Sequence, residues 1–141
     1  MGEFEGRDPG CYDTGDVATG PTVGRMPPLR VVQVARAIVD ELNDLSASSS
    51  RIANDHQLRR SAQSVAANIR EGFGRRKGAE RNQFLRIARG SAEETDEHLR
   101  THAAQKHIAP ATYWRLHHRL VVCIRMLNAL MEAAPSVSTR G

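Results

Sequence analysis

Apolar residues recur three and four positions apart in four stretches of the chain, the spacing of helices with one buried face. We expect these helices at about residues 29–46, from 52 or 54 to 72, from 79 to beyond 99, and from 110 to just before Pro135. The predicted core faces are Val31, Val34, Ala35, Ile38, Leu42 and Leu45; Leu58, Ala62, Val65, Ala66, Ile69 and Phe73; Phe84, Ile87, Ala88, Ser91, Thr95 and Leu99; and Tyr113, Leu116, Leu120, Cys123, Ile124, Leu127 and Leu130. Four such helices with short connections predict an all-α fold, an antiparallel up-down-up-down four-helix bundle.

The two ends of the chain lack this periodicity. Residues 1–28 contain six glycines and scattered acidic residues, so we interpret them as a disordered leader or an artificial extension. The bundle is expected to occupy residues 29–135, followed by a flexible tail at residues 136–141. Pro110 suits the first turn of the fourth helix, where a missing N–H costs nothing.

Glycines fall at two informative places. Gly72 and Gly74 lie where the second helix should end, and a helix C-cap favours residues that adopt positive φ. Gly90 lies inside the third helix, where glycine costs about 1 kcal/mol relative to alanine. We expect Gly90 to allow close approach of a neighbouring helix backbone; a tolerated weak position is the alternative.

Charge is distributed unevenly along the sequence. The whole chain carries a formal charge of +4, yet residues 1–28 hold five acidic and two basic residues. Residues 51–90 hold ten basic against three acidic residues. A field of this sign attracts nucleic-acid phosphate, although a solvated helix surface is the other interpretation. The candidate nucleic-acid contacts are Arg59, Arg60, Arg70, Arg75, Arg76, Lys77, Arg81, Arg86 and Arg89.

Residues that could perform catalysis are sparse. Glu94, His98 and His102 follow one another at four-residue spacing and could converge on a metal, but a polar helix stripe is the preferred interpretation. The serines lack a nucleophile elbow, and Cys123 lies on an apolar face. We therefore expect no catalytic residue, no bound metal and no cofactor.

Three further polar residues occupy neighbouring helical positions. Asn68 and Glu71 are one turn apart, and Glu94 lies on the next helix. Because buried polar groups require partners, we interpret the three chiefly as an internal network that sets the register of two helices. An acid–base pair is the sharper alternative, but the sequence supplies no substrate pocket for it.

The cysteines and the hydropathy of the chain indicate the cellular compartment. Cys11 and Cys123 are far apart and do not form a disulfide framework. No apolar run has the roughly 20 residues that a membrane span requires. A cytoplasmic protein without membrane association is expected.

Two segments, which follow each other along the chain, resemble a known protein family. They are Ser64-Val-Ala-Ala-Asn-Ile-Arg-Glu-Gly72, preceded by Gln57 and Arg60, and Phe84-Leu-Arg-Ile-Ala-Arg-Gly-Ser-Ala-Glu-Glu94. They resemble the four-helix-bundle family of ribosomal RNA intervening-sequence proteins, which includes the accessory variability determinant of diversity-generating retroelements. The resemblance implies an antiparallel bundle, assembly into a homopentamer with a basic surface and, for the retroelement member, binding of nucleic acid and a reverse transcriptase.

The sequence departs from the family pattern in two places. Residues 46–55 lack the aromatic-Pro-x-x-Glu element common in the family, and the connection between residues 102 and 110 also differs. Assembly and partner are therefore less well supported than the bundle.

Taken with the charge, these features predict a non-enzymatic, oligomeric helical bundle that binds RNA or DNA through its arginines, as an accessory protein to a reverse transcriptase in one version. The alternative is a protein-interaction scaffold that docks a partner without binding nucleic acid directly. A metal-dependent enzyme using Glu94, His98 and His102 is a third.

Overall fold

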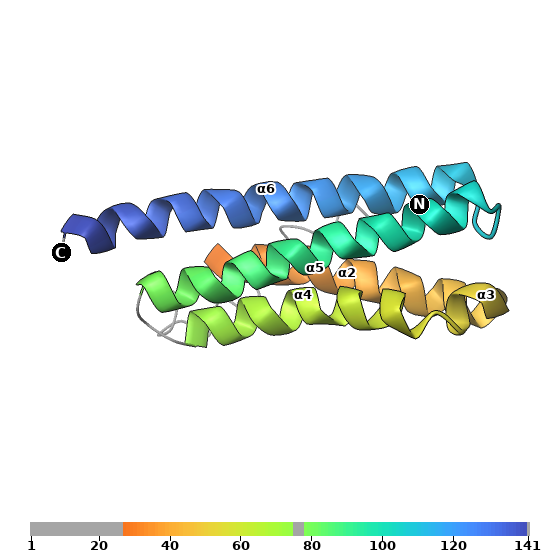
Figure 1. Ribbon diagram of the computed structural model, residues 1–141, viewed down its shortest axis with the longest axis horizontal. Coiled ribbons are helices and arrows are strands. Elements are labelled where there is room, and N and C mark those ends of the chain that lie inside the picture. The colour runs from red at the N-terminus through yellow and green to blue at the C-terminus, as the bar shows by residue number, and fades with distance from the viewer. Residues whose placement is uncertain (1–26, 75–77, 141) are drawn as a thin grey trace.

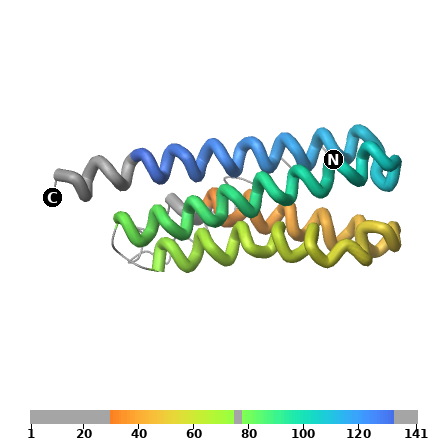
Figure 2. The backbone as a smooth tube through the Cα atoms, in the orientation of Figure 1, coloured from red at the N-terminus to blue at the C-terminus, as the bar shows by residue number. Residues whose placement is uncertain are grey.

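The computed structural model describes residues 27–74 and 78–140 as four long helices and one short helix (Figures 1 and 2). Residues 1–26 of the predicted disordered leader, Cys11 among them, lie outside the described residues, whereas residues 27 and 28 belong to the first helix. The helices are α2 (Pro27–Ser48), α3 (Ser50–Ala53), α4 (His56–Gly74), α5 (Gly78–Ala104) and α6 (Pro110–Arg140). The long helices alternate in direction, and α2 and α5 each pack against both α4 and α6. The all-α four-helix bundle is confirmed.

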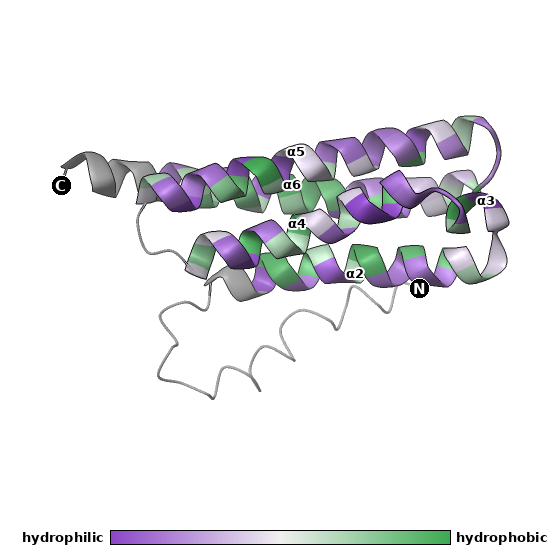
Figure 3. Ribbon diagram, turned by 60° about the horizontal axis from the view of Figure 1, so that its bottom comes forward, coloured by the Kyte–Doolittle hydropathy of each residue, from purple (hydrophilic) through white to green (hydrophobic). Residues whose placement is uncertain are grey.

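Hydrophobic residues, green in Figure 3, occur on all four long helices. The buried ones form a single core between the helices. The predicted faces of α2, α4 and α6 are confirmed: Val31, Ala35, Ile38, Leu42, Leu58, Ala62, Val65, Ile69, Leu116, Leu120, Cys123 and Leu127 are all buried. The predicted face of α5 is partly wrong. Ile87 is 48% exposed and Phe84 only partly buried, whereas Leu85 and Ala92 are fully buried beside Ala88 and Leu99.

Helix ends differ from the prediction in three places. The first helix begins at Pro27, because proline is tolerated in a first turn whose N–H groups need no intrahelical partner. The serine run interrupts the helix only at Ser49, whose hydroxyl accepts the Ile52 N–H at 3.3 Å and caps α3. Because α3 is a separate short helix, the second long helix begins at His56 rather than at residue 52 or 54. The last helix runs to Arg140, so neither an end before Pro135 nor a separate tail at residues 136–140 is observed.

Gly72, and not Gly90, is the glycine at which two helices approach closely. A Cβ atom on Gly72 would lie 3.0 Å from Phe84 Cβ and 3.2 Å from the Arg81 carbonyl oxygen, so glycine here lets α4 and α5 approach closely. A Cβ atom on Gly90 would meet no atom within 4 Å. Gly90 is therefore the tolerated weak position, and neither Gly72 nor Gly74 has the positive φ expected of a C-cap.

Polar contacts fix the helices relative to one another. Arg115 donates from Nε to Glu41 at 2.8 Å and joins α6 to α2. Between α4 and α5, the hydroxyls of Ser61 and Thr95 lie 2.8 Å apart, and both residues are buried. A directional contact in a dry interface penalises other registers more than apolar packing does.

Candidate nucleic-acid interface

The nine predicted basic contacts fall into three groups. Arg60 and Arg70 on α4 and Arg86 on α5 are exposed. Arg59, Arg81 and Arg89 are partly buried. Arg75, Arg76 and Lys77 lie outside the described residues. The exposed group can reach a phosphate without breaking a contact, so it forms the more accessible part of the predicted set.

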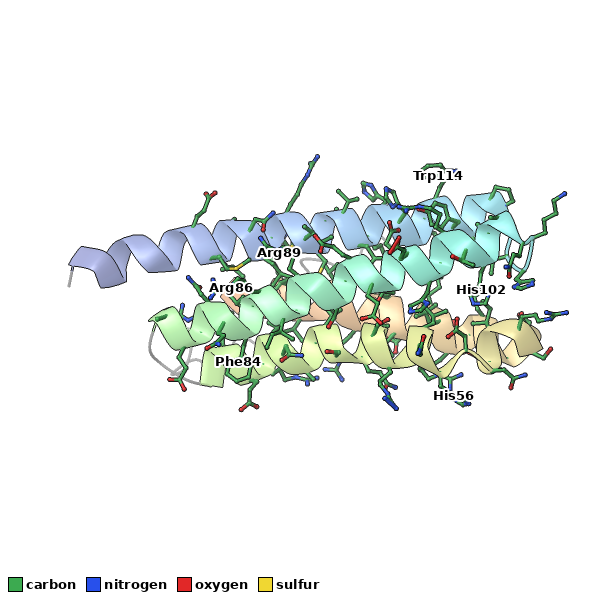
Figure 4. All side chains as sticks on the ribbon, in the orientation of Figure 1. His56, Phe84, Arg86, Arg89, His102 and Trp114 are labelled. Atoms are coloured by element: carbon green, nitrogen blue, oxygen red, sulfur yellow. The ribbon has the colours of Figure 1, made fainter. Side chains whose placement is uncertain are left out.

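The partly buried arginines support the fold. Arg59 donates to Ser46 Oγ and to the Ala53 carbonyl, both at 3.1 Å, and so ties α4 back to α2 and α3. Arg89 donates to Asn128 Oδ1 at 2.7 Å across α5 and α6 (Figure 4). The Arg81 guanidinium lies 4.9 Å from the centre of the Phe73 ring, a cation–π distance. These three side chains are already engaged within the protein.

Charge is polarised along the bundle axis. We define the hairpin half as residues 27–35, 65–74, 78–90 and 124–132, the half of the bundle next to the α4–α5 connection. These residues contain six arginines against three glutamates. The opposite half, residues 36–64 and 91–123, contains eight basic and eight acidic side chains, leaving the histidines aside. The excess positive charge of the described bundle therefore lies in the hairpin half.

Each long helix contributes one exposed arginine to the hairpin half. They are Arg30 on α2, Arg70 on α4, Arg86 on α5 and Arg125 on α6. Arg30 and Arg125 were not among the predicted contacts, because they lie far from the arginine-rich segment in sequence and come to the same half only when the helices fold antiparallel. The helical periodicity could have indicated them, since both fall outside the apolar faces.

The predicted polar network is only partly assembled. The Asn68 amide donates to the Ser64 carbonyl at 2.8 Å and to Ser64 Oγ at 2.9 Å, and Ser64 Oγ lies 2.9 Å from Ser91 Oγ on α5. Glu71 is exposed, and Glu94 lies 3.5 Å from His98 on its own helix. Serine and threonine hydroxyls thus make polar contacts between α4 and α5, and Asn68 joins them through Ser64.

The predicted histidine stripe does not converge on one point. His102 turns away from Glu94 and His98: its Nε2 lies 2.7 Å from Asp55 Oδ2 and its Nδ1 lies 2.9 Å from His107 Nδ1 (Figure 4). In residues 27–74 and 78–140, no three His, Cys, Asp or Glu side chains are arranged to hold a metal ion. The structure gives the metal-enzyme hypothesis no site in this region.

Asp55, His102 and His107 instead join the α3–α4 junction to the end of α5. Asp55 Oδ1 also accepts the Leu58 N–H at 3.0 Å and so caps α4. Burial raises the pKa of Asp55, but the bonds from Leu58 and His102 outweigh it and bring the pKa below its ordinary value. Partial burial, with the positive charge of Arg51, lowers the pKa of His107. Protonation of either group opposes this folded arrangement.

The described cysteine shows no sign of activation. Cys123 is buried in the core, and burial raises the pKa of its thiol to about 12. A thiol in this environment is a small hydrophobe rather than a nucleophile. Among the helices of residues 27–74 and 78–140, none is both long enough and apolar enough to cross a membrane.

Comparison with known proteins agrees with this geometry. The family model of the 23S rRNA-intervening sequence proteins matches residues 28–129, which include nearly all of the bundle. The chain belongs to this family. This intervening-sequence protein is also similar to a crystal structure from Bacteroides thetaiotaomicron, a protein of unknown function from the S23 ribosomal protein family. The two share 20% identity with a TM-score of 0.67, over 75% of this chain and 98% of the other, which shows a common fold. A search of curated proteins found no match.

Proposed function

We propose that this intervening-sequence protein is a non-enzymatic, homo-oligomeric bundle that binds RNA or DNA through the phosphate backbone, with the hairpin half as its contact surface. The observation that carries the proposal is the concentration of excess positive charge in that half, with one exposed arginine on each long helix. Guanidinium groups bind phosphate oxygens with charge-assisted, often bidentate hydrogen bonds.

The chemistry of the surface suggests backbone binding rather than base recognition. The whole chain contains only 4% aromatic residues, so it offers few platforms on which unpaired bases could stack. Trp114, a candidate for stacking, lies on α6 in the half of balanced charge. Binding of this kind depends on the number of phosphate contacts and little on sequence.

Oligomerisation strengthens the proposal by avidity. A homopentameric ring, as the family resemblance implies, repeats the hairpin half around an axis, so that several weak contacts act on one polyanion. Light scattering coupled to size-exclusion chromatography tests the assembly, and a monomer at micromolar concentration contradicts this part of the proposal.

A salt titration tests the binding itself. The affinity for a fluorescent RNA or DNA duplex should fall steeply with salt, with a slope of log K against log salt of about −0.9 per phosphate contact. Four contacts per protomer, one for each exposed arginine, give a slope of about −3.6 for each protomer that engages the duplex. Absence of binding at low salt contradicts the proposal and favours the alternative scaffold role.

The biological setting divides the proposal into two versions. In one, the protein assists a reverse transcriptase of a diversity-generating retroelement; in the other, it acts with the intervening sequence of a ribosomal RNA operon. Inspection of the neighbouring genes distinguishes them, because only the first predicts an adjacent reverse transcriptase and template repeat.

A further inference from the structure

A second surface of opposite character lies between α5 and α6, mostly in the half of the bundle with balanced charge and with Ile124 at the edge of the hairpin half. A groove of about 300 Å³ is bordered on α5 by Glu93 and Glu97 and on α6 by Val121 and Ile124. Leu120 contributes to its floor. The groove therefore combines an apolar wall with an acidic rim.

Trp114 extends this apolar wall toward the start of α6. Positions 114, 117, 121 and 124 are three or four residues apart and so share one helix face. The Trp114 side chain is 61% exposed and projects away from α6 (Figure 4). Its ring meets the His117 ring edge-on with 5.4 Å between centroids, and His117 is held by Asp96 at 2.9 Å. An exposed tryptophan beside a groove is typical of an interface anchor.

The two glutamates of the acidic rim differ from Asp96, which also lines the groove, in their hydrogen bonding. Asp96 is already engaged, because it bonds His117 and also accepts from Arg100 Nη2 at 2.8 Å. Glu93 and Glu97 are exposed, and within the described residues neither carboxylate has a hydrogen-bond or ion-pair partner. They are one helical turn apart, about 6 Å along α5. Arg100 also lines the groove and interacts electrostatically with Glu97, but its hydrogen bond goes to Asp96, so the rim keeps a net negative charge. Two carboxylates at this spacing match two cations one turn apart on another helix.

We propose that the α5–α6 groove docks an amphipathic helix of a partner protein, with apolar residues against Val121, Ile124 and Trp114 and arginine or lysine against Glu93 and Glu97. Helices bind in grooves through anchors three or four residues apart, which is the spacing found here. The carboxylates repel phosphate, so this surface is not an extension of the nucleic-acid interface. Both carboxylates lie outside the hairpin half, so the two surfaces can be occupied together.

The groove contains its own reporter, because Trp114 is the single tryptophan of the chain. The probe is an alanine-based helical peptide of about 18 residues with leucine and arginine on one face. Its binding to the full-length protein should shift the tryptophan emission to shorter wavelength as Trp114 is covered. A Glu93→Gln/Glu97→Gln double variant should weaken binding about tenfold, since two surface ion pairs of about 0.7 kcal/mol each are lost.

The matched control is Glu80→Gln/Glu132→Gln, which removes two exposed carboxylates elsewhere. It should leave the affinity within about twofold of the wild type, as expected for a charge change outside the site. A peptide with glutamate in place of arginine should not bind.

Three outcomes overturn the proposal: no emission shift at millimolar peptide, equal weakening by both double variants, or an emission of the free protein that already shifts with its own concentration. The last result would assign the groove to a second copy of this chain.

Discussion

Alanine substitutions at Gly72 and Gly90 should change stability in opposite directions. Both replace glycine by alanine within a helix, so both gain about 1 kcal/mol of helix propensity. They differ in what the new methyl group meets. At Gly72 it lies 3.0 Å from Phe84 Cβ and 3.2 Å from the Arg81 carbonyl oxygen, two atoms held by the backbone of α5. At Gly90 it meets no atom within 4 Å.

The magnitudes follow from these distances. Overpacking typically costs about 1–3 kcal/mol, so at Gly72 it outweighs the propensity gain and leaves the variant less stable by about 1 kcal/mol. Gly90→Ala should keep its full gain of about 1 kcal/mol. In a domain of this size, each kcal/mol corresponds to about 4 °C in melting temperature. The two variants should therefore differ by about 8 °C.

Thermal melts followed by circular dichroism measure this difference, at one protein concentration because assembly affects the melting temperature. Gly90→Ala serves as the control for helix propensity. If Gly72→Ala stabilises the protein as much as Gly90→Ala does, α4 and α5 are not in close approach at Gly72, and the packing described here is wrong.

Three further predictions concern the interior and the histidine cluster. Because folding lowers the pKa of His107, the unfolded chain is protonated at this residue at a higher pH than the folded chain, and the free energy of unfolding should begin to fall as the pH drops below about 6.5. The lowered pKa of Asp55 should cause a second loss of stability below about pH 3.8. His107→Asn should abolish the first loss and retain the second in melts across pH. Ser61→Ala and Thr95→Val should show a coupling energy of about 1 kcal/mol in a double-mutant cycle by urea denaturation; additive effects contradict the buried bond. In a Cys11→Ser variant, Cys123 should react with a thiol reagent only after unfolding, and rapid labelling of the native protein contradicts its burial.

Local periodicity predicted most of the fold, and α5 shows where it fails. Two adjacent stripes of α5 contain apolar or small residues: one passes through Phe84 and Ile87, the other through Leu85 and Ala92. Both stripes include Ala88, so spacing alone does not choose between them. The close approach at Gly72 places Phe84 beside α4 and turns Ile87 outward.

Contacts between distant segments explain the remaining differences. The Asp55 partner of His102 lies 47 residues away, and a stripe of histidines on one helix gives no indication of it. Likewise, Arg30 and Arg125 join the hairpin half only through the antiparallel packing of α2 and α6. The arginines of α4 and α5 were predictable, because one segment carries them all. Their division into exposed and engaged side chains was not, since it depends on partners such as Asn128 and Ser46.

Charge reversal in the two halves of the bundle tests the central claim most directly. Arg70→Glu/Arg86→Glu alters two exposed arginines of the hairpin half, and Arg51→Glu/Lys106→Glu makes the same change in net charge at two exposed basic residues of the other half, neither of them a predicted contact. Fluorescence anisotropy with one nucleic-acid duplex, as a function of salt, should show weaker binding and a slope reduced by about 2 for the first variant. The second variant should retain the wild-type slope. Equal loss in both variants would mean that overall charge, rather than the hairpin half, attracts the nucleic acid, and would contradict the proposed interface.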